Sequence, residues 1–304
     1  MNPICLSSPA KINLHLTILG KRPDGYHDLS MLMEKVSLCD AIRLEMIPHG
    51  IEVSDTLGGD PPARIPVEKN LVYRAAQTLA QVSDPCRGVP PAGVRIHLTK
   101  SIPMGGGLGG GSSNAATVLK ALNTLWGLHH PVEKLIPLAA KLGADVPFFL
   151  VDGPAFVTGI GDLITPLGNL AKLWIIIINP GVSVPTPWAY QEWDASRCQV
   201  RLGGMAPNEP GTLTLQNLSV RQPRTFGEVL QALHNDFETV VFPKYPEIRR
   251  AKEALLKAGA QGALMSGSGS TVFGLFETKQ ARDASLGQIK KEKDWKLWAV
   301  ENLQ

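Results

Sequence analysis

A period of two between hydrophobic and polar residues predicts β-strands at 11–18 and 94–99. In the first of these strands every second residue is apolar, so the polar side chains share the other face. They are Lys11, Asn13, His15 and Thr17. Turn-forming residues at 20–27, among them an Asp-Gly pair, end this strand. The same reasoning predicts strands at 41–46 and 173–179, a hairpin over 155–167, and a strand, a glycine turn and a second strand over 262–276.

Apolar residues three and four positions apart predict helices at 70–82, 135–142 and 246–258. A further helix is expected to follow a glycine-rich run and to end at Gly127. Between 180 and 223 the chain is rich in Pro and Gly and shows little periodicity, which predicts loops around a few short elements. Helices and strands mix throughout without repeats, and this favours an α/β or α+β fold.

The glycine-rich run PMGGGLGGGSSNAA, residues 103–116, lies between a predicted strand and a predicted helix. Its six glycines allow positive φ values, so that several backbone N–H groups can turn toward one anion. The helix that follows adds unpaired N–H groups and a partial positive charge, and Ser112, Ser113 and Asn114 suit its capping and first-turn positions. Nucleotide-dependent phosphoryl transfer is therefore the leading hypothesis.

Other functions use similar glycines. Gly105, Gly107 and Gly110 satisfy the G-x-G-x-x-G pattern of dinucleotide-binding folds, but the acidic residue expected about twenty positions later falls at Glu133, at an apparent helix start. No Lys follows the glycines as in a P-loop, and a flexible linker would not be flanked so closely by periodic segments. A nicotinamide-dependent dehydrogenase and a non-catalytic nucleotide or metabolite sensor stay open as alternatives.

The composition is that of a globular protein, with 304 residues, 44% hydrophobic and 19% charged, and its length suggests two domains or one large one. A net charge of +3, spread along the chain, gives no support to nucleic-acid binding and is compatible with a small anionic substrate. Four widely spaced cysteines indicate neither a disulfide framework nor a zinc site, which favours the cytoplasm. No targeting or membrane segment is visible, and we expect a monomer or a weak homodimer.

Four strings carry a family resemblance. SPAKINLHL at 8–16, the run at 103–116, GADVPFF around Asp145 and SGSGSTVF at 266–273 together resemble the superfamily of galactokinase, homoserine kinase, mevalonate kinase and phosphomevalonate kinase. Within it, RPDGYHDL at 22–29 and NPGVSVPTP at 179–187 resemble the enzymes that act on 4-diphosphocytidyl-2-C-methyl-D-erythritol. The matches occur in order and span nearly the whole chain.

The resemblance implies an α+β fold of two domains, with the active site between them. A ribosomal-protein-S5-like ATP-binding domain would span 1–160, and a ferredoxin-like substrate-binding domain would span 161–304. It also implies the reaction: ATP would phosphorylate the 2-hydroxyl of the cytidyl diphosphate-linked methylerythritol by direct in-line transfer, in the non-mevalonate pathway to isoprenoid precursors. Mevalonate or homoserine kinase activity is the nearer alternative.

The resemblance also implies roles in phosphoryl transfer. Asp145 would be the general base, although a helix or turn cap would explain an Asp at this position too. Lys11 would lie near Asp145 and stabilise the γ-phosphate and the developing alkoxide, where the alternative is an ordinary solvated lysine. Mg²⁺ would bind near Ser112 or Ser113, and no acidic metal ligand can be identified from spacing. The triphosphate would be bound by Pro103, Met104, Gly105, Gly106, Gly107, Leu108, Gly109, Gly110, Gly111, Ser112 and Ser113.

For the substrate, the resemblance places Tyr26 and Tyr190 on the two faces of the cytosine, because aromatic rings stack on any base. His27 would hydrogen-bond the edge of the base, and Asn13 would lie near the erythritol. Core packing explains Tyr190 about equally well. Two further glycines, Gly267 and Gly269, would let a second turn approach the phosphates, although a hairpin turn alone accounts for them almost as well. Where the family often has Pro after these glycines, this chain has Ser270.

Overall fold

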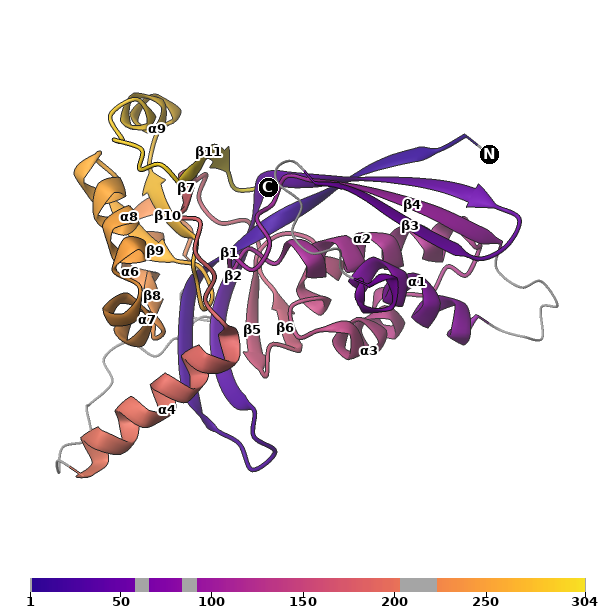
Figure 1. Ribbon diagram of the computed structural model, residues 1–304, viewed down its shortest axis with the longest axis horizontal. Helices are drawn as coiled ribbons and strands as arrows, with labels where there is room; N and C mark the ends of the chain where they lie inside the picture. The colour runs from indigo at the N-terminus through magenta and orange to yellow at the C-terminus, as the bar shows by residue number, and fades with distance from the viewer. Residues whose placement is uncertain (1, 58–65, 84–91, 203–222, 304) are drawn as a thin grey trace. The chain divides into compact units, whose positions relative to one another are not determined.

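The computed structural model describes residues 2–57, 66–83, 92–202 and 223–303 (Figure 1). The chain forms two compact units that each draw on several segments. The first unit comprises Met1–Ala10, Leu38–Met104 and Gly109–Asp152, and the second comprises Lys11–Ser37, Gly105–Leu108 and Gly153–Gln304. The long strands β1 (Ile4–Lys21) and β2 (His27–Ile47) contribute residues to both units. The predicted division at residue 160 stays a prediction.

In the first unit, three strands pair in the order β3-β4-β2. Strand β4 (Gly93–Lys100) is antiparallel to residues 41–47 of β2 and parallel to β3 (Ile51–Leu57). Helices α1 (Leu71–Val82), α2 (Gly110–Leu125) and α3 (Val132–Leu142) lie on one side of these strands (Figure 1). The short 3₁₀ helices η1 (Val67–Lys69) and η3 (Pro147–Leu150) complete the unit. Its core joins the inward face of β4 to the apolar face of α2: Val94, Ile96, Leu98, Val118, Leu119 and Leu122.

The second unit contains a four-stranded antiparallel sheet in the order β11-β7-β10-β9. Its elements follow the chain order β7 (Trp174–Asn179), α8 (Pro246–Lys257), β9 (Gly262–Met265), β10 (Val272–Phe276), α9 (Lys279–Leu286) and β11 (Lys296–Glu301). Both helices pack against the sheet. This succession of strand, helix, two strands, helix and strand is the ferredoxin-like motif, so the prediction for the C-terminal part of the chain is confirmed.

The remaining elements of the second unit include short strands that pair with β1 and β2. Strand β5 (Ala155–Gly159) pairs with β2 and with β6 (Leu163–Pro166), and β8 (His234–Asn235) pairs with β1. Helices α4 (Thr186–Leu202), α6 (Phe226–Ala232) and α7 (Glu238–Lys244) lie between β7 and α8 in the chain. These elements carry several residues of the candidate site.

Most predicted elements are present, but the prediction for 180–223 is wrong over its first half. Helix α4 runs for 17 residues, whereas loops with a few short elements were expected. Pro187 lies in its first turn, where the missing N–H costs no helical hydrogen bond. Over residues 186–197, where the burial of α4 is described, Ala189 and Trp193, one turn apart, are buried. Residues 203–222 lie outside the described part of the chain.

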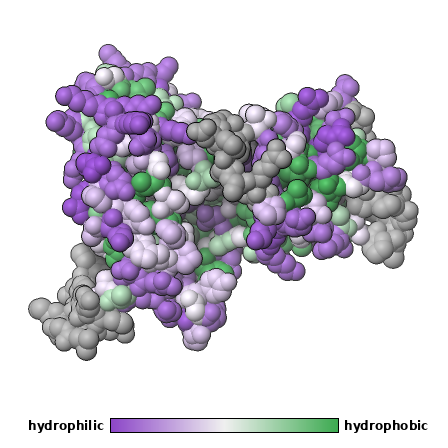
Figure 2. All heavy atoms as spheres, in the orientation of Figure 1, coloured by the Kyte–Doolittle hydropathy of each residue, from purple (hydrophilic) through white to green (hydrophobic). Residues whose placement is uncertain are grey.

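Figure 2 shows hydrophilic residues over most of the visible face, with apolar residues in small groups among them. Such scattered apolar exposure is ordinary for a folded domain. Among the described residues, no helix combines the length and the apolar character that crossing a bilayer requires.

Candidate active site

The first glycine segment, residues 105–108, is fixed to two other parts of the second unit by hydrogen bonds. The Lys11 N–H donates to the Leu108 carbonyl at 2.9 Å. The Thr271 N–H donates to the Gly106 carbonyl at 3.2 Å, and the Ser266 hydroxyl donates to the Gly107 carbonyl at 2.9 Å. Strand β1, the first glycine segment and the second glycine turn at 266–271 therefore form one connected structure, which a flexible linker would not.

At Gly107 the first glycine segment closely approaches the backbone of the second glycine turn. Its φ is +78°, in the left-handed region that side chains disfavour. A Cβ atom there would lie 2.1 Å from the carbonyl oxygen of Ser266, which belongs to the backbone. The close approach of the two segments therefore requires glycine at this position.

Lys11 and Asn13 lie side by side in the same structure, as the strand alternation predicts. The Lys11 ammonium donates to Asn13 Oδ1 at 2.6 Å, and both side chains are buried. The Lys11 Nζ is also 3.6 Å from the position that a Cβ of Gly267 would take. Lys11 is only 3% exposed, so it is not the ordinary solvated lysine of the alternative explanation.

The second glycine turn is held by side chains that the sequence analysis did not single out. Asn235 of β8 donates to the carbonyls of Met265 at 2.7 Å and Gly267 at 2.8 Å. Asn179 donates to the hydroxyl of Thr271 at 3.0 Å, and the Ser270 hydroxyl donates to the Val182 carbonyl. Ser270, which stands where the family often has Pro, thus restrains the turn by a hydrogen bond.

In the first unit, helix α2 begins at Gly110, two residues before Ser112. Gly109 is its N-cap residue, with φ of +68°, and no side chain caps the helix. Ser112, Ser113 and Asn114 therefore lie in its first turns and not at the cap. Ser113 is fully buried and its hydroxyl accepts a hydrogen bond from that of Ser8 at 2.8 Å, whereas Ser112 is half-buried.

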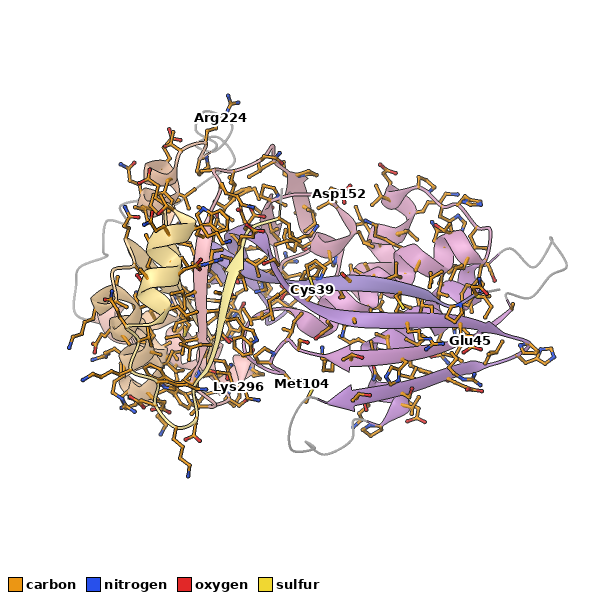
Figure 3. The ribbon with its side chains drawn as sticks, turned by 90° about the horizontal axis from the view of Figure 1, so that it is seen from above. Cys39, Glu45, Met104, Asp152, Arg224 and Lys296 are labelled. Carbon is orange, nitrogen blue, oxygen red and sulfur yellow. The ribbon has the colours of Figure 1, made fainter. Side chains whose placement is uncertain are left out.

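The segment just before the glycine run is held in place by Asp40. Asp40 of β2, which is buried, accepts hydrogen bonds from the N–H groups of Ser101 at 2.7 Å and Ile102 at 2.9 Å, and it pairs with Lys100. Pro103 follows directly, and Met104, labelled in Figure 3, is 47% exposed. A single buried aspartate leaves no spacing signal in the sequence, so Asp40 becomes recognisable only in the folded structure.

Asp145 lies in a turn between helix α3, which ends before Gly143, and the 3₁₀ helix η3. The Val146 N–H donates to the Gly143 carbonyl at 3.1 Å and closes this turn. Asp145 is half-buried and belongs to the first unit, whereas Lys11 belongs to the second. Its role as general base and its nearness to Lys11 stay predictions.

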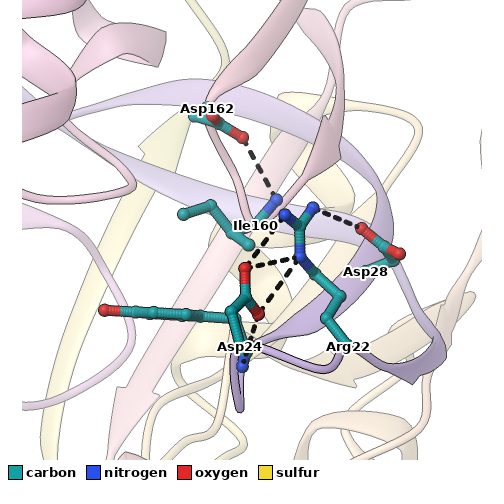
Figure 4. Close-up of polar contacts among 6 residues, drawn as sticks. Arg22, Asp24, Asp28, Ile160 and Asp162 are labelled. Carbon is teal, nitrogen blue, oxygen red and sulfur yellow. Dashed lines mark hydrogen bonds and ion pairs between the residues drawn. The ribbon is translucent and has the colours of Figure 1, made fainter.

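Tyr26 lies in the turn between β1 and β2, and the residue is 61% exposed. Arg22 braces this tip by ion pairs with Asp24 at 3.0 Å and Asp28 at 3.2 Å (Figure 4). Asp24 also accepts a hydrogen bond from the Tyr26 N–H at 3.1 Å. The hydrogen bond from Arg22 holds the pKa of Asp24 below its usual range. The exposed ring is therefore presented by an ordered turn.

His27 is packed by residues of helix α4. The ring of Tyr190 is stacked on that of His27, with centroids 4.6 Å apart and planes 19° apart, and Trp193 meets His27 edge-on at 5.9 Å. His27 Nε2 is 2.8 Å from Asp194 Oδ1. Tyr190 also meets Phe237 edge-on at 4.9 Å, so it takes part in packing as well as bordering His27.

Two family models match the chain: the GHMP kinases N terminal domain over residues 70–153 and the GHMP kinases C terminal model over residues 214–293. A protein of Citrifermentans bemidjiense named 4-diphosphocytidyl-2-C-methyl-D-erythritol kinase is 42% identical over 304 residues, 100% of each chain. The chain belongs to the GHMP kinase family.

Solved structures agree with this membership in the GHMP kinases. The crystal structure of a 4-(cytidine 5′-diphospho)-2C-methyl-D-erythritol kinase is 34% identical, with a TM-score of 0.76, and the match covers 99% of this chain and 100% of that one. A homoserine kinase from Cytophaga hutchinsonii, 22% identical with a TM-score of 0.65, shares the fold over 100% of this chain and 96% of its own. The predicted two-domain kinase fold is confirmed.

As a member of the GHMP kinases, this protein is a small-molecule kinase, and the family implies ATP as its phosphoryl donor. Both the dehydrogenase and the non-catalytic sensor are therefore set aside. The roles of individual residues stay predictions.

Proposed function

We propose that this kinase transfers the γ-phosphoryl group of ATP to the 2-hydroxyl of 4-diphosphocytidyl-2-C-methyl-D-erythritol, a step toward isoprenoid precursors. The observation that carries the proposal is the 42% identity to a protein of that name over the full length of both chains. The braced turn at Tyr26 and His27 supports it, since these residues belong to the string that resembles enzymes acting on the cytidyl substrate.

The hydrogen bonds of the first glycine segment favour an anion-binding role. The carbonyls of Gly106, Gly107 and Leu108 all accept hydrogen bonds from the surrounding protein. In a planar trans peptide the N–H points opposite to the carbonyl of the preceding residue. The N–H groups of residues 107–109 are thereby directed away from those partners, as a triphosphate-binding loop needs. The first-turn N–H groups of α2 follow directly in the chain.

The oxygen donors at the start of α2 fit Mg²⁺, which prefers hard oxygen ligands and keeps several waters. Ser112 would hold the ion, because the Ser113 hydroxyl is buried and already bonded to Ser8. Among the described residues no group of three His, Cys, Asp or Glu side chains is arranged to hold a metal. When bound, Mg²⁺ neutralises charge on the β- and γ-phosphates.

In the proposed transfer the 2-hydroxyl oxygen attacks the γ-phosphorus in line, the bond to the bridging oxygen of ADP breaks, and the hydroxyl proton passes to the Asp145 carboxylate. Lys11 stabilises the charge on the γ-phosphate and on the attacking oxygen. Its ammonium is oriented by Asn13 and by its burial near the second glycine turn. Fixing such a cation in advance avoids reorganisation during the reaction.

For the acceptor, we propose that the cytosine hydrogen-bonds His27 and stacks on Tyr190 and Tyr26. Because the rings of His27 and Tyr190 are 19° from parallel, a base lying in the plane of His27 lies nearly parallel to Tyr190. Stacking needs this orientation. Asn13 would lie near the erythritol. A cytoplasmic location and a monomeric or weakly dimeric state stay predictions.

The function is tested by ADP release with three acceptors: the cytidyl diphosphate-linked methylerythritol, mevalonate and homoserine. We expect turnover with the first acceptor only. Turnover with mevalonate or homoserine at a higher kcat/KM would refute the substrate assignment while leaving the kinase assignment intact.

The residue roles are tested in the same assay. Asp145→Asn and Lys11→Met are each expected to lower kcat by about 10²-fold or more, as loss of a positioned base or a transition-state cation does. Asp152→Asn is the matched control for the first variant, since this exposed aspartate lies in the same unit. A folded Asp145→Asn protein with wild-type turnover would remove Asp145 from the mechanism.

A further inference from the structure

Asp194, on helix α4, contacts both Lys21, the last residue of β1, and His27, the first residue of β2. Its two carboxylate oxygens have different partners: Oδ1 is 2.8 Å from His27 Nε2, and Oδ2 accepts from the Lys21 ammonium at 2.7 Å. The His27 side chain is 6% exposed, that of Asp194 is 23% exposed and that of Lys21 is 56% exposed. The buried imidazole is thus connected to a lysine near solvent through one carboxylate.

The neighbours of Asp194 favour its ionised form. Partial burial favours the neutral acid, but hydrogen bonds from Lys21 and His27 outweigh it and keep the pKa of Asp194 below its usual range. An ionised carboxylate can only accept hydrogen bonds. The hydrogen between Asp194 and His27 therefore resides on Nε2, and in a neutral imidazole the other nitrogen, Nδ1, is then an acceptor.

Helix α4 also fixes the orientation of the imidazole. Trp193 and Asp194 lie three and four residues after Tyr190, so the three side chains are on one side of the helix, and each contacts the His27 ring. A stacked ring, an edge-on ring and a hydrogen bond restrain the imidazole in three different ways. Both its orientation and its tautomer are thus set by one helix.

We propose that Asp194 is a positioning residue that makes His27 selective for an amino group on the substrate base. Cytosine presents an N–H donor at the exocyclic position where uracil presents a carbonyl oxygen. An acceptor at Nδ1 binds the cytosine amino group and faces the uracil oxygen with a lone pair, which disfavours the uridyl analogue. The inference rests on the proposed function, because it assigns the selectivity of the cytidyl site.

The first test is spectroscopic and needs no substrate. In ¹⁵N-histidine-labelled protein at pH 8, where imidazoles are mostly neutral, the two-bond ¹H–¹⁵N spectrum of wild type is expected to show His27 as the Nε2–H tautomer. His27→Gln assigns the signal. In Asp194→Asn, whose amide can donate as well as accept, the signal is expected to move toward the other tautomer or a mixture. An Nδ1–H tautomer in wild type would overturn the proposal, even if the variant does not fold.

The second test measures kcat/KM for the cytidyl acceptor and for the uridine diphosphate-linked methylerythritol. Asp194→Asn is expected to reduce the cytidyl-to-uridyl ratio by about tenfold or more, the effect of one lost hydrogen-bond preference, with the KM for ATP unchanged. Glu192→Gln, the same charge change at an exposed neighbour on α4, should leave the ratio as in wild type. A ratio in Asp194→Asn within twofold of wild type would contradict the proposal. Absence of ADP release by wild type with the cytidyl acceptor would instead refute the proposed function, and the tautomer would still decide the role of Asp194.

Discussion

Replacing Gly107 by alanine tests whether the two glycine segments must touch. The variant places a Cβ 2.1 Å from the Ser266 carbonyl oxygen, and an ordinary contact of 3.4 Å requires the two segments to separate by about 1.3 Å. A side chain at φ of +78° costs about 1–2 kcal/mol. Separation also weakens the Ser266 and Thr271 hydrogen bonds to the segment, at about 1 kcal/mol each. We expect the free energy of unfolding to fall by about 3–4 kcal/mol.

Gly105→Ala is the matched control for this variant. Its φ of +67° gives the same backbone penalty, but its nearest atom is the Ser183 hydroxyl at 3.5 Å, an ordinary contact. Urea unfolding should therefore show Gly107→Ala to be about 2 kcal/mol less stable than Gly105→Ala. Equal stabilities within about 0.5 kcal/mol would refute the argued contact.

Buried ionisable groups give three more tests, each read from urea unfolding against wild type. Burial lowers the pKa of His15 to about 4. As the pH falls from 6.5 to 4, the unfolded chain therefore binds a proton at His15 that the folded protein does not bind. Over this fall in pH the free energy of unfolding of wild type should decrease by about 3 kcal/mol relative to that of His15→Gln. Burial raises the pKa of Glu34 to about 7. Between pH 4.5 and 7 the folded protein therefore keeps a proton that the unfolded chain releases. As the pH rises from 4.5 to 8, the free energy of unfolding of Glu34→Gln should increase by about 3 kcal/mol relative to that of wild type. A pH-independent difference in either pair would contradict its assignment. Asp40→Asn, which leaves half-buried Lys100 without its countercharge, should lower the free energy of unfolding by about 3 kcal/mol at pH 7. A loss below about 1 kcal/mol would show that the pair contributes little to stability.

The sequence predicted elements whose pattern is local. Strand β4, the glycine run and helix α2 follow one another with clear changes of period, and all three are present. The N-terminal half of β2 was missed because both of its faces are covered, so polar residues such as Ser30 and Glu34 are buried beside apolar ones. A strand that is covered on both faces need not show a period of two.

The predicted shared face of Lys11 and Asn13 is confirmed, because alternate residues of one strand point to the same side of a sheet. Asn235, which holds the second glycine turn, could not be predicted in this way. It reaches the turn only because β8 pairs with β1 at Leu16, a contact between distant parts of the chain. Hydrogen bonds of this kind depend on the tertiary fold and leave no spacing in the sequence.

This difference follows the chemistry of the two halves of the reaction. Phosphate is bound largely by backbone N–H groups, whose direction is set by glycines and a helix start, so a phosphate site can be predicted from adjacent residues. A base is selected by the donors and acceptors on its edge, which side chains must match from separate elements. Here the side chains around His27 come from α4, the helix that the sequence analysis did not predict. The transfer chemistry could therefore be anticipated from local sequence, whereas Asp194, on which we propose the acceptor specificity depends, became identifiable only when α4 was seen against the start of β2.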